Sequence, residues 1–218
     1  MTSRIFKTMA PLAVALLCAG AATAQNAGGP PAGGPPPGPM DGPPVSGMAL
    51  APSKDFARLT VTSTAFDNNT FISNHYTQYG DNKSPPLSWS AGPAGTVTYV
   101  VLCEDMGGMR KDPVFHWVLY DLPASRTSLP EGIPTTPTTA DGASQGKNAR
   151  GAGYMGPRPP APQIHPYHFE VFALDAKIGI DPANADRNAV VNAMKGHVLA
   201  SGEVVAMATE KLPANAKQ

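Results

Sequence analysis

The chain is poor in cysteine: it has two among 218 residues, Cys18 and Cys103. Cys18 lies in an N-terminal segment with the features of a cleaved leader, so Cys103 would stand alone in the mature chain. A lone cysteine cannot form an internal disulfide, and the apolar stretch "TYVVLC" that ends at Cys103 predicts a buried thiol. We therefore expect packing, not cross-links, to hold the fold together.

The chain also lacks an excess of charge of either sign. Lys plus Arg and Asp plus Glu number 16 each, the formal net charge is zero, and 15% of the residues are charged. Without a basic stripe, binding to nucleic acid or electrostatic binding to a membrane is disfavoured. No apolar run reaches the roughly 20 residues that a transmembrane helix needs, so none is predicted.

The N-terminus has the three parts of a secretory signal peptide. Arg4 and Lys7 precede the apolar run "MAPLAVALLCAGAA", and Ala22-Thr23-Ala24 is a small-x-small cleavage pattern. Residues 1–24 are therefore predicted to be a signal peptide, and the mature protein to be periplasmic or secreted. Lipidation of Cys18 is the alternative, but Leu17 stands where a small residue should precede a lipidated cysteine.

The next segment, residues 25–48, is dominated by Gly and Pro and begins "QNAGGPPAGGPPPGPM". It has almost no apolar side chains to bury, which is typical of a disordered linker. A Pro-rich recognition sequence is the sharper alternative, but the segment has no basic residue to orient it. Residues 49–218 are long enough to bury one good core and are predicted to form a single domain.

Within that domain, short stretches that alternate apolar and polar residues, or are apolar and β-branched, predict a mainly β fold of packed antiparallel sheets. One helix is predicted from about Asp186 to Leu199, with Asp186 as its N-cap and Val190, Val191, Met194 and Val198 on its apolar stripe. A cis X–Pro bond is expected in Ser84-Pro85-Pro86, since only proline makes that isomer accessible. The predicted strands are Phe56–Ala65, Leu87–Trp89, Thr96–Cys103, Phe115–Leu122, Tyr167–Leu174 and Gly202–Met207.

The segment "GYMGPRPPAPQIHPYHFEVFALD" ends in a strand that carries polar candidates for a site. Because residues two apart share a face of a strand, His165 and Tyr167 should point one way and His168 the other. Diverging histidines with no carboxylate or cysteine at ligand spacing disfavour a metal site. A His and a Tyr beside a Gly-rich loop suit a small anion, since imidazolium, phenol and backbone N–H are all donors. A packed Tyr with a His at the sheet rim is the structural alternative.

Two more strands end near polar groups. His116 and Trp117 are neighbours on one strand and should face opposite ways, so a core Trp117 would direct His116 elsewhere. Asp105 ends the buried strand Thr96–Cys103, where a carboxylate could keep a histidine charged. Gly142-Ala-Ser144-Gln-Gly146 fits the Gly-x-Ser-x-Gly pattern, but its flanks predict neither the strand nor the helix that a nucleophile elbow needs.

The order of these pieces resembles the phosphatidylethanolamine-binding protein (PEBP) family, in particular its bacterial Raf-kinase-inhibitor-like (YbhB/YbcL-type) branch. The similarity runs from about Phe56 to Ala208. It is carried by "SPPLSW" (84–89), the strand into Asp105, "RKDP" (110–113), "HW" (116–117), "LPEG" (129–132), "GYMGPRPP" (153–160) and "HPYHFEVFALD" (165–175).

The resemblance implies two packed antiparallel β-sheets with a helix near the C-terminus, and a small pocket for phosphate, phosphoryl or phospholipid head groups. The pocket residues would be Asp105, His116, Gly156, His165 and Tyr167, with Pro157 shaping the loop. His165, Tyr167 and the Gly156 N–H would bond the anion, and Asp105 and His116 would set charge and orientation at its floor. No cofactor and no metal are implied.

One motif departs from the family pattern Asp-Pro-Asp-Ala-Pro, because this chain reads Asp105-Met106-Gly107-Gly108-Met109. The second acid and both prolines are absent, so the pocket is expected to be reshaped, and the two glycines should loosen the loop.

Three functions are compatible with these residues. The leading one is an exported binding protein for a phosphoryl-type small molecule, without catalysis. The second is an inhibitor or regulator of an enzyme through a protein partner, as kinase and protease inhibitors of the family are. The third is an enzyme in which His116 or His165 acts as general acid or base. The oligomeric state, monomer or homodimer, is left open by the sequence.

Overall fold

The computed structural model describes residues 44–108, 110–214 and 216. All of them belong to one unit that runs from Gly38 to Gln218. The predicted signal peptide, and the predicted linker up to residue 43, lie outside the described residues. Among the described residues, no helix is long and apolar enough to cross a membrane.

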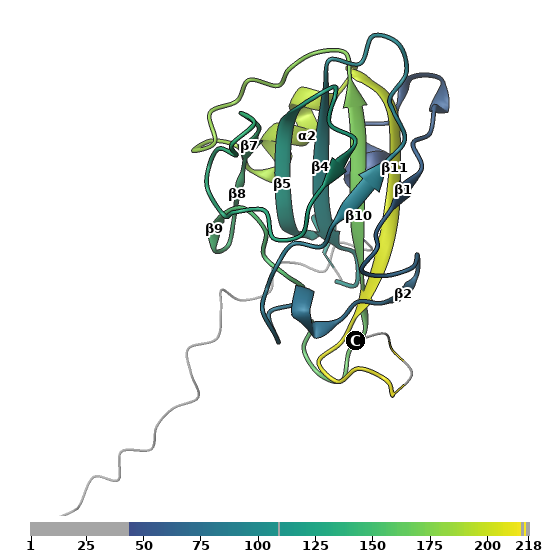
Figure 1. The fold of residues 1–218 in the computed structure, drawn as a ribbon, viewed down its shortest axis with the longest axis vertical. Helices are drawn as coiled ribbons and strands as arrows, with labels where there is room; N and C mark the ends of the chain where they lie inside the picture. Colours follow the sequence, from purple (N-terminus) through teal and green to yellow (C-terminus); the bar gives the residue numbers. More distant parts are fainter. Residues whose placement is uncertain (1–43, 109, 215, 217–218) are drawn as a thin grey trace, which may run out of the picture. The chain divides into compact units, whose positions relative to one another are not determined.

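A large sheet forms the centre of the fold (Figure 1). Its strand order is β2-β11-β10-β4-β5-β7, with antiparallel pairs throughout except that β2 runs parallel to β11. The bounds are Thr70–Phe71 for β2, Thr98–Asp105 for β4, Val114–Pro123 for β5, Ser144–Gln145 for β7, His165–Leu174 for β10 and Val198–Ala208 for β11.

A smaller antiparallel sheet covers one face of the large one. It consists of β1 (Val61–Thr62), β3 (Leu87–Trp89) and β6 (Ser128–Leu129). Side chains of both sheets share one core, in which Trp89 of β3 packs edge-on against Tyr99 of β4 with ring centroids 5.5 Å apart. A separate hairpin joins β8 (Lys147–Asn148) to β9 (Gly151–Ala152). The prediction of a mainly β fold of packed antiparallel sheets is confirmed.

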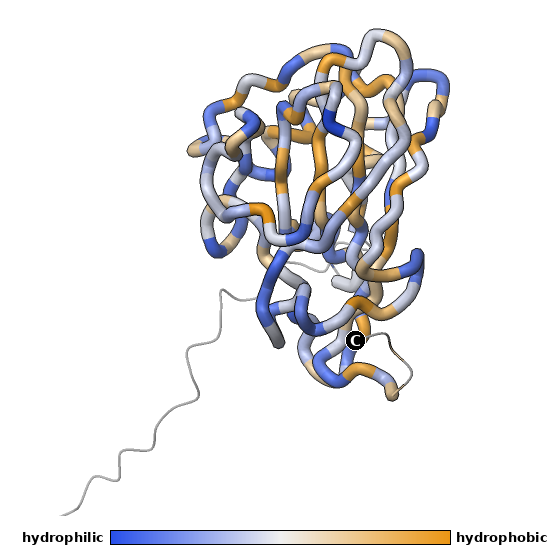
Figure 2. Tube along the Cα trace, viewed as in Figure 1, coloured by the Kyte–Doolittle hydropathy of each residue, from blue (hydrophilic) through white to orange (hydrophobic). Residues whose placement is uncertain are grey.

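The opposite face of the large sheet is covered by α2 (Arg187–Met194). The Asp186 side chain caps it by accepting a 2.8 Å hydrogen bond from the N–H of Ala189, as predicted. Val190 and Met194 pack against buried side chains of β4 and β5 in a second core. Hydrophobic residues accordingly concentrate along the central strands, and the outer loops are mostly hydrophilic (Figure 2).

Three short helices precede or connect strands: α1 (Gly47–Leu50) and the single 3₁₀ turns η1 (Lys54–Phe56) and η2 (Asn74–Tyr76). The last residues of the predicted linker, 44–48, lead into α1 and contact the sheet. They dock through a buried ion pair, Glu104 with Arg187, whose Oε1 and Nε atoms are 2.6 Å apart. The Gly47 N–H donates to the other Glu104 oxygen at 2.9 Å, and Arg187 Nη2 donates to the Val45 carbonyl at 2.6 Å.

Three local predictions were wrong. The helix ends at Met194, not Leu199, because Gly196 takes a positive φ of 82° and Val198 already belongs to β11. The expected strand Phe56–Ala65 is reduced to β1, since Phe56 itself has a positive φ of 53° within η1. A cis bond was expected in Ser84-Pro85-Pro86, whereas the cis peptide bond among the described residues is Ala161–Pro162.

The other strand predictions agree with the structure to within a few residues, and Cys103 is fully buried as expected. Ser144 lies on the short edge strand β7 and is followed by Gly146 and β8, not by a helix. This is not the strand–turn–helix of a nucleophile elbow, in agreement with the sequence-based interpretation.

Candidate functional site

The pairing of β4 with β10 brings three of the predicted residues together. Tyr167 is directly opposite Asp105 in the antiparallel register, and His165 begins β10 two residues earlier on the same face. The Asp105 carboxylate accepts a 2.9 Å hydrogen bond from the Tyr167 hydroxyl and lies 2.9 Å from His165 Nδ1 through each of its oxygens. His168, predicted to face the other way, bonds Glu203 instead at 2.8 Å.

Asp105 is held by three donors and is nearly enclosed. Besides Tyr167 and His165, the N–H of Gly107 donates to its Oδ1 at 2.8 Å. The side chains of Asp105 and His165 are each 11% exposed. Burial, together with the charge of Asp105, raises the pKa of Tyr167, so its hydroxyl stays protonated and donates at neutral pH. Asp105, held by these hydrogen bonds, therefore fixes the orientation of the His165 ring.

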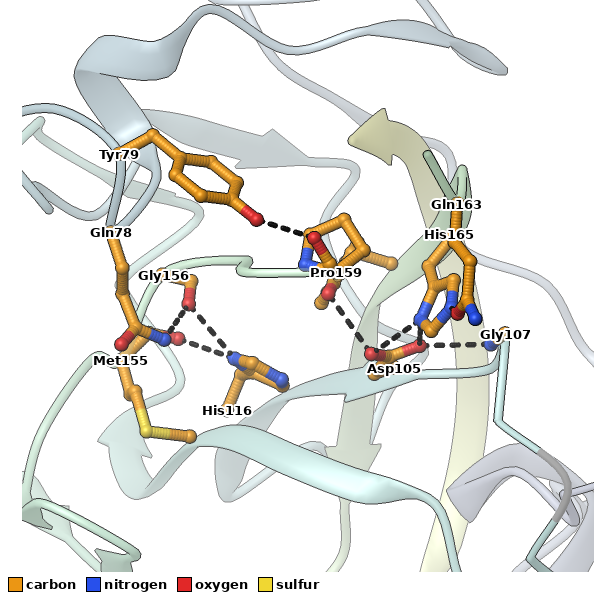
Figure 3. A network of polar contacts seen from close by, with 11 residues as sticks. Gln78, Tyr79, Asp105, Gly107, His116, Met155, Gly156, Pro159, Gln163 and His165 are labelled. Atoms are coloured by element: carbon orange, nitrogen blue, oxygen red, sulfur yellow. Dashed lines mark hydrogen bonds and ion pairs between the residues drawn. The ribbon is translucent and has the colours of Figure 1, made fainter. Parts of the chain in front are cut away.

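The second ring nitrogen of His165 is also occupied. Nε2 lies 2.7 Å from Oε1 of Gln163, and the ring is thereby placed between the carboxylate and the amide (Figure 3). The Asp105 carboxylate accepts from Nδ1, and the Gln163 amide occupies Nε2, so each ring nitrogen has a partner.

His116 reaches the cluster through a β-bulge. Cys103 pairs with Trp117 and Glu104 pairs with Phe115, so His116 has no partner on β4. The prediction that neighbours on this strand face opposite ways was wrong here: Trp117 is buried in the core between the sheets. His116 is turned toward the same side and packs edge-on against the Tyr167 ring at 5.0 Å.

The tautomer of His116 follows from its partners. Nδ1 donates to the Met155 carbonyl at 2.7 Å and is 3.2 Å from the Gly156 carbonyl (Figure 3). Carbonyls only accept, so Nδ1 carries the hydrogen. Burial lowers the pKa of His116, which favours the neutral ring at pH 7. Nε2 is then a hydrogen-bond acceptor.

Gly156 lies beside His116, but its backbone is already engaged. Its N–H donates to Oδ1 of Asn82 at 2.7 Å, and its carbonyl accepts from Nε2 of Gln78 at 2.6 Å. A Cβ at position 156 would come within 2.6 Å of the Tyr76 carbonyl, so only glycine fits. The predicted bond from the Gly156 N–H to an anion stays a prediction; it would require the Asn82 side chain to give way.

Sequence reasoning did not identify Gln163, Gln78, Asn82 or the packing role of Gly107. The first three are polar residues on loops, with no spacing that relates them to the strands. From the sequence, we expect Gly107 to loosen its loop. In the structure, a Cβ at Gly107 would lie 2.3 Å from Cγ of His165, so this glycine packs against the ring.

Among residues 44–214 apart from 109, no cluster of three or more His, Cys, Asp or Glu side chains could hold a metal ion.

Comparisons with known proteins concern the family and the fold. The family model for phosphatidylethanolamine-binding protein matches residues 62–209. A UPF0098 protein of Methanothermobacter thermautotrophicus is 35% identical over 150 residues, which cover 68% of this chain and 97% of that protein. The UPF0098 protein YbhB of Escherichia coli is 38% identical over 131 residues, covering 59% of this chain and 82% of YbhB.

Solved structures show the same fold. The crystal structure of Escherichia coli YbcL, described as a member of the mammalian PEBP family, superposes with a TM-score of 0.65 at 30% identity. The match covers 71% of this chain and all of YbcL. The PEBP homologue CT736 of Chlamydia trachomatis gives a TM-score of 0.62 at 30% identity, covering 71% of this chain and 99% of CT736. This chain belongs to the phosphatidylethanolamine-binding protein family, and within it resembles the UPF0098, YbhB and YbcL branch.

Proposed function

We propose that this protein is an exported binding protein for phosphate or phosphoryl-type anions and performs no catalysis. The observation that carries the proposal is the His165 ring, which Asp105 orients at the end of the central sheet and which is nearly buried. A fixed ring N–H in a poorly solvated place binds an anion more strongly than the same group in water does.

His116 adds a condition on the ligand. Its neutral ring offers an acceptor at Nε2, next to the donor ring of His165 across the Tyr167 ring. A ligand that contacts both histidines would present one anionic oxygen and one hydrogen-bond donor. A singly protonated phosphate and phosphoethanolamine both meet this condition, whereas dimethyl phosphate, which has no donor, does not.

Inorganic phosphate alone should bind weakly. Charge-assisted hydrogen bonds contribute roughly 1.5 to 3 kcal/mol each, while association costs about 4 kcal/mol or more, and the His165 ring already bonds Asp105. A tighter ligand needs an organic part that contacts apolar groups. Met106, half-buried directly after Asp105, is one adaptable wall for it.

The absence of turnover is proposed from the roles of the polar groups. His165 and Tyr167 both hydrogen-bond Asp105, and Nδ1 of His116 donates to the Met155 carbonyl. Nε2 of His116 remains as an acceptor, and we assign it to the hydrogen-bond donor of the ligand and not to a general base.

Export is proposed from the leader pattern of residues 1–24 alone. N-terminal sequencing of the protein recovered from fractionated cells tests it: a mature chain that begins at Gln25 in the periplasm or medium is expected. A full-length chain in the cytoplasm would contradict this part of the proposal.

The test of binding is an amide NMR titration of the mature chain, residues 25–218, with phosphate and then phosphoethanolamine. Saturable shifts at Gly156, His165 and Tyr167 are expected, and a His165→Ala variant that remains folded should lose them. If neither ligand shifts these amides at millimolar concentrations, the proposal fails, and a role as a regulator that binds a protein partner takes its place.

A further inference from the structure

The loop before β10 places a neutral acceptor where the proposed anion has to bind. Gln163 Oε1 lies 2.7 Å from Nε2 of His165, while Nδ1 of the same ring faces Asp105. No ring nitrogen of His165 is left to donate to a ligand (Figure 3). An N–H donates well to one acceptor at a time, so an anion and the Gln163 amide compete for the same hydrogen.

The two partners of His165 differ in how firmly they are held. Asp105 ends β4, is buried, and is also bonded by Tyr167 and Gly107. Gln163 lies on an exposed stretch, residues 160–164, and the hydrogen bond that the structure gives its side chain is the one to His165. Gln163 is therefore the partner that can leave.

We propose that Gln163 is an internal competitor for the anion site: its side chain caps His165 Nε2, and a bound phosphoryl oxygen replaces it. This inference rests on the proposed function and names the residue that sets its affinity and selectivity. A neutral amide oxygen accepts a weaker hydrogen bond from a ring N–H than an anionic oxygen does. Anions therefore displace Gln163 readily, and neutral hydroxyl or carbonyl ligands do so poorly.

The apparent affinity for phosphate equals the intrinsic affinity multiplied by the fraction of molecules in which Gln163 has left His165. A net hydrogen bond of ordinary strength corresponds to roughly a two- to tenfold change in a binding constant. Removing the amide should tighten phosphate binding by that factor. Replacing it with a carboxylate, in Gln163→Glu, should weaken phosphate binding by at least as much, because the new side chain would place a charged acceptor beside Nε2 and would repel the anion.

The experiment compares inorganic phosphate binding by the full mature chain and by Gln163→Ala, Gln163→Glu and Ile164→Ala, using the amide shifts of Tyr167 and the ring ¹⁵N signals of His165. Ile164 is the matched control, because it is the neighbouring loop residue, it is 51% exposed, and its side chain has no polar group that could compete for the His165 ring. Its truncation should leave the affinity within about twofold of the unmodified chain.

We expect Gln163→Ala to bind phosphate most tightly, the unmodified chain less tightly, and Gln163→Glu least tightly. If the unmodified chain binds phosphate and Gln163→Ala binds it equally or less tightly, the inference is wrong and the proposed function stands. If Gln163→Ala alone binds, the inference stands, but the proposed function fails for phosphate because the unmodified chain does not bind it. If no variant binds phosphate, the proposed function fails, and the inference fails with it.

Discussion

Gly107 lies directly against the ring of His165. A Cβ built on Gly107 would be 2.3 Å from Cγ and 2.7 Å from Cδ2 of His165, whereas the next residue, Gly108, has no heavy atom within 4 Å of such a Cβ. Neither glycine has a positive φ, so the space around each decides whether a side chain is tolerated. The loop that departs from the family motif is thus shaped around the imidazole.

This contact predicts different outcomes for two adjacent substitutions. Gly107→Ala should force the His165 ring away from Asp105 and lower the free energy of unfolding by about 1 to 3 kcal/mol, the usual cost of overpacking. Gly108→Ala should change it by less than about 0.5 kcal/mol. Urea unfolding measures both, and the His165 ring signals report the displacement. Equal effects of the two substitutions would show that the loop is not packed as described.

The buried pair of Glu104 and Arg187 predicts a large loss when one partner is removed. Their side chains are 0% and 3% exposed, so Arg187→Met leaves Glu104 buried without its cation, at a cost of about 3 to 5 kcal/mol. Arg126, paired with Asp141 on the surface, is the control: Arg126→Ala should cost at most about 1 kcal/mol. Thermal and urea unfolding compare them. A small effect at Arg187 would mean that residues 44–50 do not depend on this ion pair for docking.

We predict that ionisation of Glu170 lowers the stability of the folded protein as the pH rises. Burial, and then the charge of Glu104, raise the pKa of Glu170 well above its ordinary value of 4.5. The folded state therefore holds this proton more tightly than the unfolded state, so the contribution to stability is full below about pH 4.5 and falls as the pH approaches the folded pKa. Glu170→Gln cannot ionise, and its advantage over the unmodified chain should grow between about pH 5 and pH 8 in urea unfolding. A constant difference across that range would contradict the assignment.

We predict that the His116 ring is neutral at pH 7 and carries its hydrogen on Nδ1. Because burial lowers the pKa of His116 below 6.5, the unfolded chain binds this proton more readily than the folded chain does. Its contribution to stability is thus present above about pH 6.5 and is lost as the pH falls through the folded pKa. Ring ¹⁵N NMR at pH 7 should show the Nδ1–H tautomer. A doubly protonated ring at that pH would remove the acceptor that the proposed ligand requires.

We predict that the Cys103 thiol does not react until the protein unfolds. It is fully buried, and burial raises its pKa well above the usual value, which suppresses the reactive thiolate. A thiol reagent should label the mature chain at the rate of unfolding, and rapidly in denaturant. Fast labelling of the native protein would contradict the position of β4 in the sheet.

The core strands were predictable because their apolar runs are long and local. β4, β10 and the N-cap of α2 were located to within a few residues, since alternation and capping depend on neighbours in the sequence. The face shared by His165 and Tyr167 followed from the same two-residue period. The ends of elements were less predictable: Val198 has the right spacing for the helix stripe, and its pairing in β11 overrides that pattern.

By itself, then, the sequence determined the class of fold, the positions of most strands along the chain and the family, because these depend on periodicity and on motifs that lie close together along the chain. Only the tertiary structure decided that a bulge turns His116 toward Tyr167, that Gly107 packs on His165, and that Gln163 caps its ring. These contacts depend on the register between strands and on where a loop returns to the sheet. No local pattern of residue types contains that information.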